Sequence, residues 1–374
     1  MPKPRVTFPR MGAGTLVVQS FLAELGFDVV LPPPVTRETL ALGGRFAPEF
    51  ACLPLKVNLG NYLQAIPEGV DAVFMAGGIG PCRFGLYGEV QREILRALGY
   101  EVPFIVVEPP ERHLSEIVES AVRFLGAGFW RRLPWAVLLA LEKAAALDRI
   151  ERLVPAAAPR IEPARRPELW REKELFLARL AASSSLAGIR RLLAETTARI
   201  AALPRADFGV RLRVMLAGEM LVVIEPAVNF DLERRLGWMG VEVRRTIFIS
   251  EWIRDHLIKS ALRLDWQRPL RAMARPYLSR FIGGHGLETV AHTVEAARNG
   301  YDGVIQLAPL GCMPEVTAMD IIRAVGRDTG LPVLSLLLDE HTAETACLTR
   351  VEAFVDLMEN RRRAGRGAPS ALRG

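Results

Sequence analysis

Hydrophobic and polar positions follow the same order twice along the chain. In residues 69–108 an apolar run is followed by a Gly/Pro-rich loop, an amphipathic helical pattern and a second apolar run, and residues 300–340 repeat that order. The spacing Gly-x-Asp-x-Val opens both copies, at Gly69 and at Gly300. Short apolar runs that alternate with helical periodicity are typical of βαβ units. The repeat therefore predicts two similar domains.

The periodicity elsewhere completes an alternation of strands and helices in each half. We expect strands at Arg5–Pro9, Phe27–Pro32, Asp71–Ala76, Val102–Val107, Val210–Leu216 and Val241–Ile249, and helices at Thr15–Leu25, Thr36–Phe46, Glu89–Leu98, Phe230–Met239, Glu251–Leu264 and Thr342–Arg361. Apolar strands between amphipathic helices indicate largely parallel sheets. The predicted fold class is α/β, with two Rossmann-like (flavodoxin-like) parallel-sheet domains that face a cleft and a helical insert between them.

The segment between the two halves has a different pattern. Residues 111–204 contain amphipathic stretches rich in Arg and Glu, separated by a Pro/Ala-rich stretch at 154–169 that we interpret as a linker. We therefore divide the chain into an N-terminal α/β domain (1–110), a helical segment (111–204), a C-terminal α/β domain (205–360) and a basic disordered tail (361–374).

Composition and charge exclude several classes of protein. Half of the 374 residues are apolar and the net charge is +6, but the basic residues are not interleaved with aromatic ones as a nucleic-acid-binding face requires. The first residues lack the apolar core of a signal peptide, and the most apolar helical stretch is too short to cross a bilayer. We expect a cytoplasmic protein that binds neither nucleic acid nor membranes, in which disulfides are rare.

Three of the four cysteines, Cys52, Cys82 and Cys312, lie in Gly/Pro-rich loops. Cys82 and Cys312 each follow the first strand of a repeat copy, at the edge of a parallel sheet where ligands bind. Counting back from the repeat places the loop of Cys52 and the Gly-Gly-His-Gly loop of His285 at equivalent positions. If the two halves face each other, the three thiols and His285 converge on one cleft.

Three thiols in one cleft favour a soft metal centre. Thiolates select iron–sulfur clusters or zinc, and three thiolates with an open fourth position suit a [4Fe–4S] cluster with one reactive iron. Lys56 and Arg83 are each close to a cysteine in sequence and would offset thiolate charge, while His285 is a candidate contact to the cluster or a substrate. Cys347 lies in a helical stretch without Gly or Pro, so we expect it to pack in the core.

Several segments together resemble one known family. CLPLKVNLGNYL, GPCRFGLYGEVQREIL, GGHGLETV, PLGCMPE and DEHTAETACLTRVEAFVDL resemble, in this order, the 2-hydroxyacyl-CoA dehydratase D-component superfamily, and its stand-alone branch related to CoA enzyme activases in particular. The resemblance implies Rossmann-like domains around a [4Fe–4S] cluster whose three cysteine ligands map to Cys52, Cys82 and Cys312. It also implies an ATP-dependent activator that supplies low-potential electrons, and in the dehydratases an acyl-CoA substrate.

The sequence leaves several alternatives to this function open. No P-loop motif occurs, so we expect the ATP-dependent activator or electron donor to be a separate protein. The chain could be a dehydratase or reductase subunit acting on an acyl-CoA, or a non-enzymatic maturation or scaffold factor. Zinc could replace the cluster, and a double-cubane cluster would need ligands from a second chain, as in a homo- or heterodimer.

Overall fold

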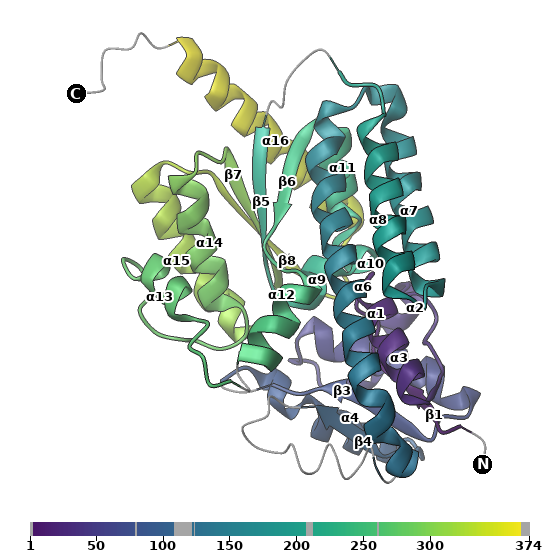
Figure 1. The fold of residues 1–374 in the computed structure, drawn as a ribbon. Helices are drawn as coiled ribbons and strands as arrows, with labels where there is room; N and C mark the ends of the chain where they lie inside the picture. Colours follow the sequence, from purple (N-terminus) through teal and green to yellow (C-terminus); the bar gives the residue numbers. More distant parts are fainter. Residues whose placement is uncertain are drawn as a thin grey trace.

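The computed structural model describes residues 3–78, 81–107, 122, 124–206, 212–259 and 262–367. Figure 1 shows two α/β lobes, an N-terminal lobe (residues 3–107) and a C-terminal lobe (residues 212–367), with long helices standing beside both. The tail residues 368–374 and most of the first helix expected in the middle segment lie outside the described residues. No described helix is long and apolar enough to cross a membrane.

The N-terminal lobe contains a four-stranded sheet with the order β2-β1-β3-β4. Every neighbouring pair of its strands is parallel. Its elements are β1 (Arg5–Thr7), α1 (Thr15–Leu25), β2 (Asp28–Val29), α2 (Arg37–Phe46), α3 (Leu53–Ala65), the 3₁₀ helix η1 (Ile66–Glu68), β3 (Ala72–Ala76), the 3₁₀ helix η2 (Arg83–Leu86), α4 (Tyr87–Ala97) and β4 (Phe104–Val107).

The C-terminal lobe repeats this arrangement, with a parallel sheet in the order β6-β5-β7-β8. Its elements are β5 (Leu212–Gly218), α9 (Met220–Ile224), α10 (Pro226–Asn229), α11 (Leu232–Trp238), β6 (Val241–Arg245), α12 (Ile249–Trp252), a π-helix (Ile253–Lys259), α13 (Arg268–Ala274), α14 (Gly286–Arg298), β7 (Gly303–Pro309), α15 (Met313–Thr329), β8 (Val333–Leu338) and α16 (Glu344–Gly367). Two sheets of the same strand order confirm the predicted α/β fold class.

The two repeat copies also share a side-chain contact. The carboxylate of Asp71, just before β3, accepts a hydrogen bond of 2.7 Å from the backbone N–H of Arg5 at the start of β1. The carboxylate of Asp302, just before β7, accepts a bond of the same length from the N–H of Arg213 in β5. The aspartate of Gly-x-Asp-x-Val therefore joins the starts of the two inner strands in both lobes. This shared hydrogen bond explains why the same spacing occurs in both copies of the repeat.

The insert consists of the 3₁₀ helix η3 (Gly126–Gly128), α6 (Phe129–Ala157), two short 3₁₀ turns (Ala158–Arg160 and Pro163–Arg165), α7 (Arg166–Ala182) and α8 (Leu186–Ala201). The linker expected at 154–169 is therefore shorter than the Pro/Ala composition indicated. Pro155 stands inside the last turn of α6 and Pro167 in the first turn of α7, a position that suits proline because its missing N–H has no helical partner there.

The largest hydrophobic core joins the insert to both lobes. It contains Val17 of α1, Leu147 of α6 and Val243 of β6, all buried. The lobes are therefore not two separate cores joined by a spacer, because the buried face of α6 is common to both. Cys347 on α16 belongs to this cluster and is 5% exposed, as expected for a packed helix residue.

Further boundaries differ from expectation, and the helix expected at Glu251–Leu264 is divided into α12 and a π-helix that ends at Lys259. The strand predicted to continue to Ile249 ends at Arg245. The N–H groups of Ile249 and Ser250 instead donate hydrogen bonds to the carboxylate of Asp148 on α6, and this contact fixes the start of α12. The basic tail expected from residue 361 begins as helix, since α16 continues to Gly367.

Candidate functional site

The three loop cysteines occupy the same structural position, the residue that immediately precedes a helix. Cys52 precedes α3, Cys82 precedes η2, which continues into α4, and Cys312 precedes α15. Burial raises the pKa of all three thiols, and the N–H groups of Leu55, Phe84 and Glu315, each in the turn that follows, offset part of that rise. Helix N-termini favour negative charge, so these positions reduce the cost of a buried thiolate without removing it.

Cys52 and Cys312 come from opposite lobes and pack in one buried cluster. They are 8% and 7% exposed, and the other buried residues of the cluster are Leu55, Met75 and Tyr87. The two loops approach closely: at Gly311, whose φ is +78°, a Cβ would lie 3.1 Å from the carbonyl oxygen of Phe50. Burial raises the pKa of Cys52 to about 11, with smaller contributions from Glu219 and Cys82.

Cys82 lies against the Gly-Gly-His-Gly loop of the C-terminal lobe. Gly283 and Gly284 have φ values of +95° and +46°, and a Cβ on Gly284 would lie 3.6 Å from the Cys82 sulfur. A Cβ on Gly283 would lie 2.9 Å from the Cys82 backbone nitrogen, so a side chain there requires the loop to move. The structure thus brings Cys52, Cys82 and Cys312 to the junction of the two lobes.

Two carboxyl groups that the sequence analysis did not select act on these thiols. Glu219 follows β5, and burial raises its pKa to about 7. Glu315 lies in the first turn of α15 and is fully buried. Its carboxyl group accepts hydrogen bonds from Thr289 (3.0 Å) and Gln306 (2.9 Å), and burial raises its pKa to about 8. Glu219 raises the pKa of all three cysteines. Its place after a strand of a parallel sheet was the signal that could have identified it.

In the structure, Lys56 and His285 each face a carboxylate that the sequence analysis did not indicate. The ammonium of Lys56 lies 2.6 Å from the carboxylate of Glu340 in the other lobe. Its helical position one turn after Cys52 turns it toward that lobe. His285 precedes α14, as Cys52 precedes α3, but its ring faces Glu288 (Nε2 to Oε2, 3.6 Å) and His256. Burial lowers the pKa of His285 to about 4, so the ring is neutral at pH 7.

Arg83 remains near the thiols. Its guanidinium donates a hydrogen bond of 3.1 Å to the carbonyl oxygen of Phe50, two residues before Cys52, and its charge lowers the pKa of Cys82. Arg83 therefore links the two cysteine loops of the N-terminal lobe.

The donor set can be compared with the metal centres expected from the sequence. Among the described residues, no three His, Cys, Asp or Glu side chains are placed to hold a single metal ion. A [4Fe–4S] cluster imposes a different requirement, because each cysteine binds its own iron. Two buried thiols and the half-buried thiol of Cys82, each just before a helix, with acids whose pKa is raised and one nearby guanidinium, fit an anionic cluster with thiolate ligands. Bound there, such a cluster would supply one-electron chemistry.

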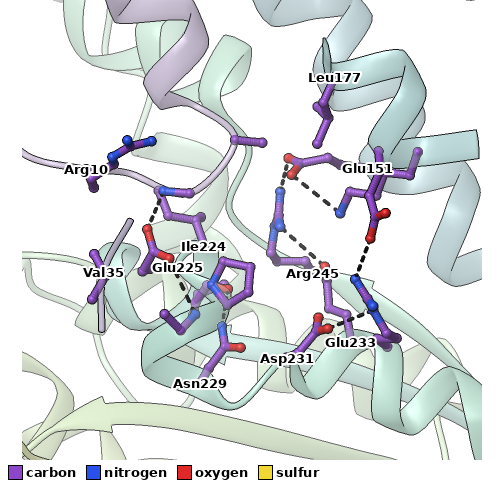
Figure 2. Close-up of a pocket in the computed structure, with 18 of the residues that line it drawn as sticks. Arg10, Val35, Glu151, Leu177, Ile224, Glu225, Asn229, Asp231, Glu233 and Arg245 are labelled. Atoms are coloured by element: carbon purple, nitrogen blue, oxygen red, sulfur yellow. Dashed lines mark hydrogen bonds and ion pairs between the residues drawn. The ribbon is translucent and has the colours of Figure 1, made fainter. Parts of the chain in front are cut away.

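A cavity of about 420 Å³ lies elsewhere in the junction, where the insert meets both lobes (Figure 2). One wall is an ion network: Arg245 is paired with Glu151 and with Glu233, and Lys173 lies 3.9 Å from Glu151. None of the cysteines lines this cavity. The network joins the insert to the C-terminal lobe along this wall of the cavity.

Fold and site together define a two-lobed α/β protein with a thiol-lined junction. Residues 13–77, which run from the start of α1 through β3 and include Cys52, match the family described as CoA enzyme activase uncharacterised domain. In this part of the N-terminal lobe the chain is therefore similar to that CoA enzyme activase domain. No curated protein matches the chain.

Proposed function

We propose that this chain is an iron–sulfur protein that binds a [4Fe–4S] cluster through Cys52, Cys82 and Cys312. The observation that supports the proposal is that these three cysteines each precede a helix and lie where the two lobes meet: Cys52 and Cys312 pack in one buried cluster, and Cys82 lies against the Gly-Gly-His-Gly loop. Without a metal, burial keeps the Cys52 thiol protonated at neutral pH. A metal centre that binds thiolates would displace such protons, and this would account for cysteines placed at a junction of two lobes. The relation of the N-terminal lobe to CoA enzyme activase proteins supports it.

The proposed role is to receive low-potential electrons from a separate ATP-dependent activator. The sequence has no P-loop motif, so hydrolysis of ATP would take place on the partner. Burial raises the pKa values of Glu219 and Glu315 to about 7 and about 8, so both carboxyl groups are partly protonated at pH 7 and add less negative charge beside an anionic cluster than ordinary carboxylates would. Action on an acyl-CoA is the second candidate, and only the family relation favours it, because the cavity described above lies away from the thiols.

Anaerobic reconstitution with iron and sulfide tests the proposal. The loaded protein should be brown and contain about four irons per chain, as one cubane requires. Serine at position 52, 82 or 312 should abolish the colour, because each removes one ligand from an iron. Cys347→Ser is the matched control, since Cys347 on α16 is as buried as Cys52 and Cys312 but belongs to the large hydrophobic core. A colourless wild-type protein, or full iron in all three serine variants, would refute the proposal.

A further inference from the structure

Tyr87 makes a contact that distinguishes one cysteine from the other two. It is the first residue of α4, is 3% exposed, and packs edge-on against Phe84 with a ring separation of 5.2 Å. Its hydroxyl group is hydrogen-bonded to the sulfur of Cys52. Among the described residues, no side-chain hydroxyl reaches the sulfur of Cys82 or of Cys312. Cys52 alone therefore has a hydroxyl partner in addition to a backbone N–H.

The direction of this hydrogen bond follows from the charge on sulfur. Between a thiol and a phenol either group can donate, but a thiolate has no proton, so Tyr87 must then be the donor. Hydrogen bonds to a charged acceptor are stronger than neutral ones, so the contact gains strength when Cys52 becomes a thiolate.

We propose that Tyr87 donates a hydrogen bond to the Cys52 thiolate and thereby raises the reduction potential of the cluster bound there. The inference rests on the proposed function. An added electron increases the negative charge on the ligand sulfurs, so a donor at one of them stabilises the reduced state more than the oxidised state. Tyr87 is a positioning residue in this account: it touches a ligand of the cluster and not the substrate. The iron bound by Cys52 would differ electronically from the irons bound by Cys82 and Cys312.

Tyr87→Phe removes the hydroxyl group and leaves the ring. In reconstituted protein with a full iron count, the variant should have a lower midpoint potential than the wild type. Tyr62→Phe is the matched control, because Tyr62 is fully buried in the same lobe but packs in a cluster without cysteines and its hydroxyl has no partner in the described structure. An unchanged potential in Tyr87→Phe, an equal fall in Tyr62→Phe, or loss of iron from Tyr87→Phe would overturn the tuning role.

A second measurement on metal-free protein separates this inference from the proposed function. Infrared difference spectra resolve the S–H stretching bands, and Cys52→Ser identifies the band of Cys52. Tyr87→Phe should shift that band, whereas Tyr62→Phe should leave it in place. An unmoved band would overturn the inference even if the cluster binds. A shifted band in a protein that takes up no iron would retain the hydrogen bond and refute the proposed function.

Discussion

The ion pair between Lys56 and Glu340 leads to the most specific prediction about stability. Lys56 lies on α3 in the N-terminal lobe and Glu340 follows β8 in the C-terminal lobe; the charged atoms are 2.6 Å apart, and the side chains are 7% and 11% exposed. Lys56 also donates a hydrogen bond of 3.2 Å to the carbonyl oxygen of Glu49. The pair thus joins the lobes one helical turn from Cys52.

The magnitude follows from burial and distance. At 2.6 Å and an effective dielectric constant of about 20, the Coulomb attraction is roughly 6 kcal/mol. Desolvation of both charges offsets much of that, so the intact pair adds little net stability. Removal of one partner is different, because it leaves the other charge buried and unpaired, which costs about 3–5 kcal/mol. We therefore expect Lys56→Met to lower the free energy of unfolding by about that amount.

Urea unfolding followed by circular dichroism measures the change. Glu340→Gln should be similarly destabilised, and the double variant Lys56→Met/Glu340→Leu should recover much of the loss, because no charge is then left buried. Arg96→Met is the control, since Arg96 and Glu93 form a pair with side chains 56% and 59% exposed, and such pairs contribute about 0–1 kcal/mol. A Lys56→Met variant no less stable than Arg96→Met would refute the reasoning.

Two further predictions concern the loops around the thiols. Gly283→Ala should destabilise the protein more than Gly99→Ala: both glycines have left-handed backbones (φ +95° and +88°), but a Cβ meets Cys82 only at Gly283 and nothing within 4 Å at Gly99. Equal unfolding midpoints in urea would contradict the close approach. Burial raises the pKa of Glu315 from 4.5 to about 8 in the folded state. Between these pH values the folded chain keeps a proton that the unfolded chain has released. The stability of the fold therefore falls as the pH rises through that range. Glu315→Gln should remove a slope of up to about 1.4 kcal/mol per pH unit; an unchanged pH profile of the metal-free protein would show that the group does not titrate in this way.

The repeat made much of the fold predictable. Its alternation of apolar runs and helical periodicity is local, because a strand buried on both faces must be apolar throughout; all seven residues of β7 are buried. The equivalence of the Cys52 loop and the Gly-Gly-His-Gly loop also followed from counting residues, and each loop precedes the helix before the inner strand of its lobe. Errors arose where a distant side chain decides an end, as Asp148 does at α12.

The sequence by itself determined the alternation of strands and helices, the duplicated unit and the placement of Cys52, Cys82 and Cys312 in loops that precede helices, because these depend on periodicity and on residues close together in the chain. Tertiary structure alone decided which groups surround the thiols. It directed Lys56 to Glu340 across the junction and placed Tyr87 on Cys52, because such contacts depend on how two lobes and a shared insert pack. It also buried Glu219 and Glu315 beside the thiols, since the protonation of a carboxyl group depends on the solvent and charges around it and not on its neighbours in sequence.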